Sequence, residues 1–228
     1  MKISEVFTTI QGEGLLLGVP SLFIRTSGCN LRCSWCDTPY TSWNAEGEDW
    51  PQQRLLDWVA GFPHYRHVVL TGGEPMMLPA LVPLTRALHE AGKHITIETA
   101  GTVYQPVVCD LMSLSPKLAN STPHDRENGR YAEAHEQLRI RPEVLTRLTT
   151  EYDYQLKFVV NNPLDLDEIE SICRSLNAPP DRVLLMPEGI SADTLQQRAT
   201  WLVEICKQRG YRFCPRLHVL LYGNQRGV

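Results

Sequence analysis

The sequence predicts an α/β protein in which parallel strands alternate with helices, arranged as an open, partial (β/α) barrel or as a doubly wound sheet. Three observations predict it. Short apolar runs alternate with amphipathic stretches over most of the chain. The apolar runs, such as VVL at 68–70 and FVV at 158–160, contain almost no polar residues, which is typical of strands that helices cover on both faces. Six such runs are too few for a closed eight-stranded barrel.

The expected elements follow one another in a regular order. Strands are expected at residues 21–26, 67–71, 94–99, 111–115, 155–160 and 183–186, and helices at 51–60, 78–91, 141–150, 165–176 and 192–209. Residues 122–137 fit neither period, so we expect a loop or cover over the site, or a dimer contact. Residues 217–222 form an apolar, strand-like run near the carboxyl terminus. No repeat or linker-like stretch interrupts the chain, so residues 1–228 are expected to form one domain.

Composition and charge exclude several classes of protein. Of the 228 residues, 43% are hydrophobic and 21% are charged, which is ordinary for a globular protein. The net charge of −4 gives no strong field that would attract nucleic acid or an anionic membrane, so a small-molecule ligand is expected. The chain lacks the ~18 consecutive apolar residues of a membrane helix and starts with MKISE, unlike a signal peptide. We therefore expect a cytoplasmic protein.

Three of the seven cysteines lie close together, directly after the first expected strand. Cys29, Cys33 and Cys36 are separated by three and then two residues, so a single loop can wrap around one metal centre. A structural zinc ion takes four protein ligands, and the nearest other cysteine, Cys109, is far away along the chain. Three thiolates on a four-iron cluster instead leave one iron free for a substrate or cofactor. A zinc site completed by a distant Cys or His is the alternative.

The CxxxCxxC loop, with the aromatic Trp35 before its last cysteine, resembles that of the radical S-adenosylmethionine (SAM) enzymes. The resemblance implies a [4Fe–4S] cluster whose open iron binds SAM, and a partial (β/α)6-type radical SAM barrel with parallel strands. The run TGGEP at 71–75 resembles the GGE motif of that family, in which glycine lets the backbone approach the cofactor and Glu74 faces its ammonium group. A plain turn with a surface carboxylate is the alternative.

Further motifs narrow the resemblance. The runs TTIQGEG (8–14), FIR (23–25), CDT (36–38), ETAG (98–101), SPK (115–117) and HVLLYGNQRGV (218–228) resemble, from end to end, the 7-carboxy-7-deazaguanine synthases. The resemblance implies a ring-contracting lyase that converts 6-carboxy-5,6,7,8-tetrahydropterin to 7-carboxy-7-deazaguanine with loss of ammonia, in 7-deazapurine and queuosine biosynthesis. It also implies Mg²⁺ as a cofactor beside the [4Fe–4S] cluster and S-adenosyl-L-methionine.

The same resemblance assigns roles to individual residues. The expected cluster ligands are Cys29, Cys33 and Cys36, and the expected magnesium ligand is Thr38. The expected cofactor contacts are Trp35, Cys36, Asp37, Gly72, Gly73, Glu74, Ser115, Pro116 and Lys117. The expected substrate contacts are Ile10, Gln11, Gly12, Glu13, Arg25, Thr71 and Val228.

The chemistry of the substrate residues suits a pterin. The Gln11 amide and neighbouring backbone groups can pair with its edge, Glu13 can accept from its amino-pyrimidinone, and Arg25 offers a planar fork to its carboxylate. The carboxylate of Val228 can also accept from the ring. The structural alternatives are turn positions for the first two side chains, a surface ion pair for Arg25 and a frayed end at Val228. Thr38 has an alternative as a plain loop residue.

The resemblance further implies an electron donor such as flavodoxin or ferredoxin, and a homodimer. Two other classes of function stay open. A radical activating enzyme is also small and carries CxxxCxxC, but it needs a face for docking a protein, whereas Gln11, Glu13 and Arg25 favour a small substrate. A zinc or iron–sulfur module without catalysis would leave the run 71–75 without a role.

Overall fold

The structure, a computed structural model, describes residues 1–228 and contains one nine-stranded sheet. The strands are β1 (Lys2–Ile10), β2 (Pro20–Thr26), β3 (Glu48–Asp49), β4 (His67–Gly72), β5 (His94–Thr99), β6 (Leu111–Leu114), β7 (Tyr154–Val160), β8 (Val183–Pro187) and β9 (Arg212–Phe213). The α-helices are α1 (Pro39–Ser42), α2 (Gln52–Ala60), α3 (Leu81–Glu90), α4 (Ala132–Arg139), α5 (Pro142–Glu151), α6 (Asp165–Ser175), α7 (Ala192–Arg209) and α8 (Leu217–Tyr222). Short 3-10 turns lie at Pro75–Met77, Ala119–Ser121, Arg126–Gly129 and Pro180–Arg182.

The sheet is parallel except at one edge. Its strand order is β3-β1-β2-β4-β5-β6-β7-β8-β9. Strand β1 is antiparallel to β2 and β3, and every neighbouring pair from β2 to β9 is parallel. The six predicted strands correspond to β2, β4, β5, β6, β7 and β8, so the parallel α/β prediction is confirmed. Because β3 and β9 end the order without pairing to each other, the barrel is open and partial.

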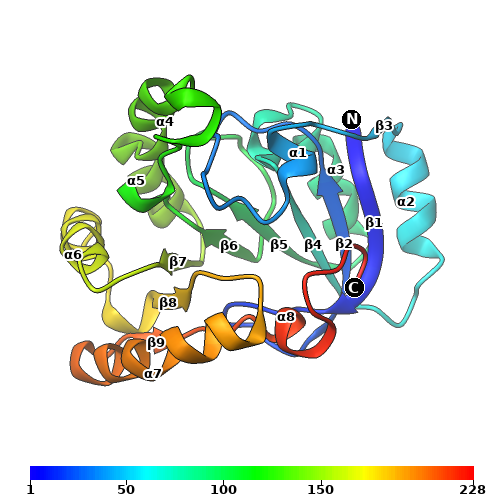
Figure 1. Cartoon of the computed structure of the whole chain (residues 1–228). Coiled ribbons are helices and arrows are strands. Elements are labelled where there is room, and N and C mark those ends of the chain that lie inside the picture. Colours follow the sequence, from blue (N-terminus) through cyan, green and yellow to red (C-terminus); the bar gives the residue numbers. More distant parts are fainter.

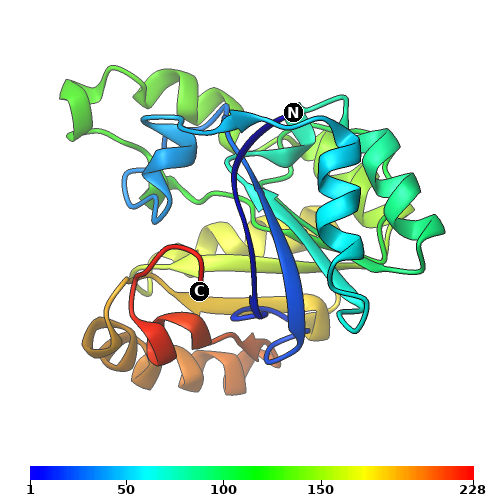
Figure 2. The same cartoon turned by 90° about the vertical axis from the view of Figure 1, so that its right-hand side faces the viewer.

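Figure 1 shows α2, α3, α5, α6 and α7 around the outside of the curved sheet. Between helices and sheet lies a core cluster of 29 buried residues, among them Leu70 and Phe158 from the strands and Leu84 from α3. The loop after β2 and the C-terminal tail lie together on the side of the sheet away from α2 and α3 (Figure 2). No helix combines the length and the apolar character that crossing a membrane requires.

Helix α7 has the bounds that the sequence predicts, and both of its ends have a local cause. The side chain of Ser191 accepts a hydrogen bond from the backbone N–H of Thr194, which caps the first turn. Gly210 follows the last turn with a φ of 70°, a left-handed conformation that glycine adopts without strain. Strand β5 also matches its predicted bounds, because its two isoleucines alternate with polar residues at the period of a strand.

One expectation about the end segments is wrong, and one strand there was not predicted. The strand-like run at 217–222 is helix α8, in which Val219 is buried while Leu220, Leu221 and Tyr222 are exposed. A six-residue run with five apolar residues has no periodicity that separates a strand from a helix, so the sequence could not decide. The sequence also does not predict β1, whose side chains are mostly half-buried and mix apolar residues with threonines.

The segment 122–137 is only partly a loop. Its second half enters α4, which is eight residues long and ends at Arg139. The helix was missed because only His135 is buried on it, and one buried position gives no apolar period.

Two glycines after β4 allow the cysteine loop to pack closely on the sheet. A Cβ atom at Gly72, where φ is +133°, would overlap the backbone N and O of Thr26. A Cβ atom at Gly73 would overlap the carbonyl oxygen of Gly28 and lie 2.8 Å from that of Thr41. The N–H of Gly73 donates to the carbonyl of Thr26 at 3.2 Å, and that of Gly28 donates to the carbonyl of Thr41 at 2.8 Å. The glycine pair is therefore a packing requirement here.

We expect Gly72→Ala to lower the free energy of unfolding by at least about 2 kcal/mol, because backbone strain and overlap with Thr26 add. The matched control is Gly92→Ala, at a φ of +73° with no atom within 4 Å of the added Cβ, where strain alone costs about 1–2 kcal/mol. Urea unfolding of both variants measures the difference. Equal losses in the two variants would mean that the close packing on Thr26 has no energetic importance.

Candidate active site

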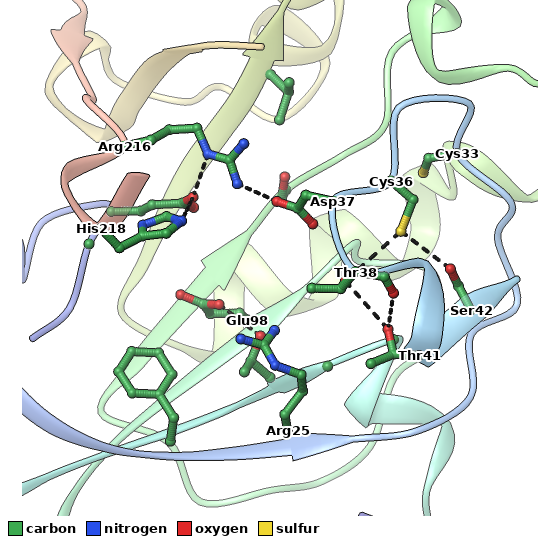
Figure 3. Close-up of a pocket in the computed structure, with 18 of the residues that line it drawn as sticks. Arg25, Cys33, Cys36, Asp37, Thr38, Thr41, Ser42, Glu98, Arg216 and His218 are labelled. Atoms are coloured by element: carbon green, nitrogen blue, oxygen red, sulfur yellow. Dashed lines mark hydrogen bonds and ion pairs between the residues drawn. The ribbon is translucent and has the colours of Figure 1, made fainter. Parts of the chain in front are cut away.

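A cavity of about 430 Å³ opens at the carboxyl ends of the parallel strands. Its walls come from the end of β1, the cysteine loop after β2, the ends of β4 to β7 and the C-terminal tail. All of the predicted site residues line it except Glu74 and Pro116. Figure 3 shows the cysteine loop on one side of the cavity and Arg216 and His218 on the other. The fold thus gathers motifs from both ends of the chain.

The three cysteines of the loop lie in one small apolar cluster. Cys33 packs with Leu31 and Ala100, and Cys29 and Cys36 pack against them. All three thiols are free. No group of three or more His, Cys, Asp or Glu side chains is gathered tightly enough for a single metal ion. Three thiolates are one fewer than the four protein ligands of a structural zinc site and fit a cluster, in which each thiolate binds a different iron atom.

Burial determines the protonation of these thiols. It raises the pKa of Cys29 to about 11 and that of Cys33 to about 12, so both are neutral at pH 7 in the metal-free chain. Iron binding would release the protons, because metals bind the thiolate. The sulfur of Cys36 lies 3.2 Å from the hydroxyl of Ser42 and 3.9 Å from that of Thr38.

Two tryptophans fasten the loop to its surroundings. The indole N–H of Trp35 donates to the backbone oxygen of Asn120 at 3.0 Å, and the Asn120 amide donates to Asp165 at the start of α6 at 2.8 Å. The indole N–H of Trp43 donates to the carbonyl of Cys33 at 3.0 Å. The loop is therefore held by side-chain contacts on both sides of its last cysteine.

The Glu74 side chain, expected from the resemblance to face the ammonium group of the cofactor, does not line the cavity. Its side chain is 0% exposed and accepts hydrogen bonds from Thr99 Oγ1 at 2.7 Å, Ala100 N at 2.8 Å and Met76 N at 3.1 Å. Burial raises its pKa against the opposing effect of these donors. Glu74 joins the end of β4 to the end of β5, because the backbone N–H groups there need an acceptor. The neighbouring Gly73 does line the cavity.

The run 115–117 contributes two of its three residues to the wall of the cavity. Ser115 and Lys117 line the cavity, whereas Pro116 does not. The Lys117 ammonium donates to Ser115 Oγ at 2.8 Å and lies 5.8 Å from the Trp35 ring centre. Its position places one cation beside the cysteine loop.

A carboxylate that sequence reasoning did not select lies at the far side of the cavity. Glu98 Oε1 accepts from the Gln11 amide at 3.1 Å, and its Oε2 accepts from Thr71 Oγ1 at 2.8 Å. The Gln11 side-chain oxygen accepts from the N–H of Glu13 at 3.1 Å. The sequence could have indicated Glu98 as a site residue, because it belongs to the ETAG run at the end of a predicted strand.

Glu13 forms buried ion pairs with two cations. It contacts the Lys157 ammonium, and its Oε1 lies 3.1 Å from Nε of Arg216, which also contacts Asp37. Burial opposes the charge on Glu13, but Lys157 and Arg216 outweigh it and hold the pKa of Glu13 well below its usual range. Burial lowers the pKa of His218, although Glu13 opposes this at 4.0 Å. Glu13 is therefore ionised and the imidazole is neutral near pH 7.

Arg216 and His218 escaped the sequence analysis. They lie in the tail that follows β9 and reach Glu13 across almost the whole length of the chain. His218 begins the run HVLLYGNQRGV, but that run assigned it no role, and Arg216 lies just before the run, outside any motif.

Arg25 has a carboxylate partner within the protein. Its Nε lies 2.7 Å from Glu5 Oε1, which also accepts from the Tyr40 hydroxyl at 2.9 Å. Both partners of this pair are largely buried, and Arg25 lines the cavity. The terminal nitrogens of its guanidinium make no hydrogen bond within the chain, so they can receive a ligand carboxylate.

The C-terminal tail lies along the cavity mouth. The Arg226 guanidinium lies 3.7 Å from the Tyr40 ring centre and donates to Glu46 at 3.1 Å. Val228, the last residue, lines the cavity. The terminus is therefore tied down on the site.

We expect Glu13→Gln to lower the free energy of unfolding by about 3–5 kcal/mol, because it leaves the buried Lys157 ammonium without its carboxylate partner. Lys157→Met should cost less, because Glu13 keeps its ion pair with Arg216. The double variant should cost about 1–3 kcal/mol less than the sum of the two. Denaturant unfolding measures this cycle. The control is Lys207→Met, which removes the exposed pair with Glu204 and should cost less than about 1 kcal/mol. Strict additivity at Glu13 and Lys157 would contradict a direct pairing.

Comparisons with known proteins agree with this geometry. Residues 23–120 match the Radical SAM superfamily. The chain is 46% identical to a 7-carboxy-7-deazaguanine synthase from Rhodopirellula baltica, over 100% of this chain and 89% of the relative. It is 42% identical to a 7-carboxy-7-deazaguanine synthase from Halobacterium salinarum, over 98% of this chain and 91% of the relative.

A solved structure agrees as well. The crystal structure of QueE from Escherichia coli is similar with a TM-score of 0.71 and 27% identity, covering 95% of this chain and 94% of that one. The expected family is confirmed by both kinds of similarity: the chain belongs to the 7-carboxy-7-deazaguanine synthases of the radical SAM superfamily.

Proposed function

We propose that this chain converts 6-carboxy-5,6,7,8-tetrahydropterin to 7-carboxy-7-deazaguanine with loss of ammonia, in 7-deazapurine and queuosine biosynthesis. One observation carries the proposal: a single cavity has a three-cysteine loop at one side and a set of hydrogen-bonding side chains suited to a heterocycle at the other. The family and this cavity together make the protein a radical SAM lyase with a [4Fe–4S] cluster and SAM as cofactors.

Cys29, Cys33 and Cys36 are the proposed cluster ligands. When bound, the cluster and SAM supply one-electron chemistry and abstraction of a hydrogen atom from the substrate. The proposed SAM contacts at the cavity surface are Trp35, Cys36, Asp37, Gly72, Gly73, Ser115 and Lys117. Glu74 acts behind this surface by holding the ends of β4 and β5.

The proposed substrate contacts are Ile10, Gln11, Gly12, Glu13, Arg25, Thr71 and Val228. Glu98 joins them, because its carboxylate already orients the Gln11 amide and the Thr71 hydroxyl. Two acceptors, Glu98 and Glu13, suit the N–H groups of an amino-pyrimidinone ring. The free nitrogens of Arg25 suit the carboxylate of the pterin. These side chains orient the ring and exclude water from it.

Thr38 is the proposed magnesium ligand. Its hydroxyl lies beside the last cysteine of the loop and accepts from Thr41 Oγ1 at 3.4 Å, which leaves a further lone pair toward the cavity. A hydroxyl is a hard oxygen ligand of the kind that Mg²⁺ takes together with a substrate oxygen. The ion would then hold the pterin carboxylate between Thr38 and Arg25.

The proposal also includes a protein electron donor such as flavodoxin or ferredoxin, a homodimer and a cytoplasmic location. The seven free cysteines, none of them in a disulfide, support a reducing compartment. The cluster requires an external electron, which supports a donor protein.

We expect anaerobically purified protein with reconstituted iron and sulfide to turn over the carboxy-tetrahydropterin in the presence of SAM and a reductant. Cys29→Ala, Cys33→Ala and Cys36→Ala should each lose the four-iron electron paramagnetic resonance signal and all turnover. Cys206→Ala, a buried cysteine on α7, is the matched control and should keep both. A cluster that forms without pterin turnover would favour a radical activating enzyme, and a colourless, zinc-containing protein would overturn the assignment.

We expect Thr38→Val to lose most of the stimulation of turnover by Mg²⁺ while the iron content stays unchanged, because it removes the ligand oxygen and keeps the volume. Thr38→Ser keeps the hydroxyl and should retain the stimulation. Steady-state rates with and without Mg²⁺, at matched iron content, measure both. An identical magnesium dependence in the Val variant and the parent would rule out this ligand.

A further inference from the structure

Residues 118–139, which follow the SPK run and contain no predicted site residue, pack on the outer side of the cysteine loop. The Tyr131 ring meets that of Trp43 edge to face, with ring centres 5.6 Å apart, and the Arg126 guanidinium lies 3.8 Å from the Trp43 ring centre. Leu138 packs on the apolar cluster that contains Cys33. This segment therefore contacts the loop on the side opposite to the cavity.

His135, on α4, makes one of the hydrogen bonds between this segment and the loop. The residue is 2% exposed, and its Nδ1 accepts from the backbone N–H of Arg32 at 3.1 Å. Its Nε2 lies 2.9 Å from Ser121 Oγ, which donates to the carbonyl of Leu118 at 2.6 Å. Because Nδ1 accepts and Ser121 uses its own proton on Leu118, the ring proton must lie on Nε2. Both ring nitrogens are satisfied in one tautomer.

Ser121 holds the loop a second time. Its carbonyl accepts from the backbone N–H of Ser34 at 2.8 Å. Arg32 and Ser34 are the two neighbours of Cys33 in the sequence. The amides on both sides of the middle cysteine are therefore bound by one pair of residues, His135 and Ser121.

The hydrogen bonds to His135 and Ser121 keep two backbone amides of the loop from donating to sulfur. Elsewhere in the same loop the N–H of Leu31 lies 3.4 Å from the sulfur of Cys29, so backbone amides of the loop can reach sulfur. The amides of Arg32 and Ser34 are bound to acceptors outside the loop instead. Hydrogen bonds to cluster sulfurs stabilise the reduced, more negative state and so change its reduction potential. Withholding two amides should keep that potential low.

We propose that His135 is a positioning residue for the cluster: by accepting from the Arg32 amide it fixes the loop around Cys33 and keeps this amide from donating to sulfur. The proposal rests on the cluster assignment made above. It gives a role to the segment after β6 that is separate from covering the substrate.

Replacing His135 by amides of two lengths tests this role. In His135→Asn the side-chain oxygen takes the place of Nδ1 and can still accept from Arg32. In His135→Gln the amide reaches the place of Nε2, so it can meet Ser121 but not Arg32. We expect the Gln variant to show a less negative midpoint potential and to lose iron to a chelator several-fold faster than the parent, and the Asn variant to remain close to the parent in both.

The readouts are an electron paramagnetic resonance redox titration and the rate of iron transfer to a chelator, both on reconstituted protein. The control is His124→Gln, on the same segment, where the exposed side chain makes no hydrogen bond to the loop. Parent-like values in the Gln variant would overturn the proposal. Equal defects in the Asn and Gln variants would also overturn it, because they would indicate a packing role. A parent protein without any [4Fe–4S] signal would instead contradict the proposed function.

Discussion

The ion pairs of Glu13 are the interactions on which the shape of the site depends. An open barrel has no hydrogen bonds between its first and last strands, so other contacts must join its two edges across the mouth. Glu13 comes directly after β1, Lys157 lies on β7, and Arg216 precedes α8. The N–H of Leu217 also donates to the carbonyl of Gly12 at 2.9 Å. The site therefore has a fixed width although the sheet does not close.

The value of this buried ion-pair network lies in fixing the positions of the residues around the cavity more than in stabilising the fold. Removing charges from water costs several kcal/mol per ion, and well-packed apolar residues of similar volume often stabilise a protein as much. An apolar contact, however, tolerates sliding, whereas ion pairs with hydrogen-bond geometry fix direction and distance. Arg216 also contacts Asp37, next to the last cysteine of the loop, and donates to the carbonyl of Gly189 at 2.6 Å. The Arg216 guanidinium thus fixes the relative positions of Glu13, of the cysteine loop at Asp37 and of the segment that follows β8.

The sequence could predict the features that depend on residues close together along the chain, such as strands and motifs. It could not predict side-chain contacts between residues far apart in the sequence. The six parallel strands and the cysteine loop carry their own patterns, and their motifs do end at one cavity. The sequence places Glu74 in a motif but could not show its hydrogen-bond partners, because its carboxylate accepts from the N–H of Ala100 at the end of another strand. Arg216 has no local signal, since its partner Glu13 lies near the other end of the chain.

The charges of the cavity distinguish its two halves. Of the five Lys and Arg side chains that line it, Arg25, Lys157, Arg216 and Arg226 all have carboxylate partners within the chain. Lys117 has none, and its ammonium donates to the neutral hydroxyl of Ser115. An ammonium without a carboxylate partner gains more from an added anion than a paired cation does, which supports the proposed role of Lys117 as a cofactor contact. The other cations of the cavity are already paired with carboxylates of the chain. A ligand beside them is therefore selected by the geometry of its hydrogen bonds, and a negative charge is not enough to bind it.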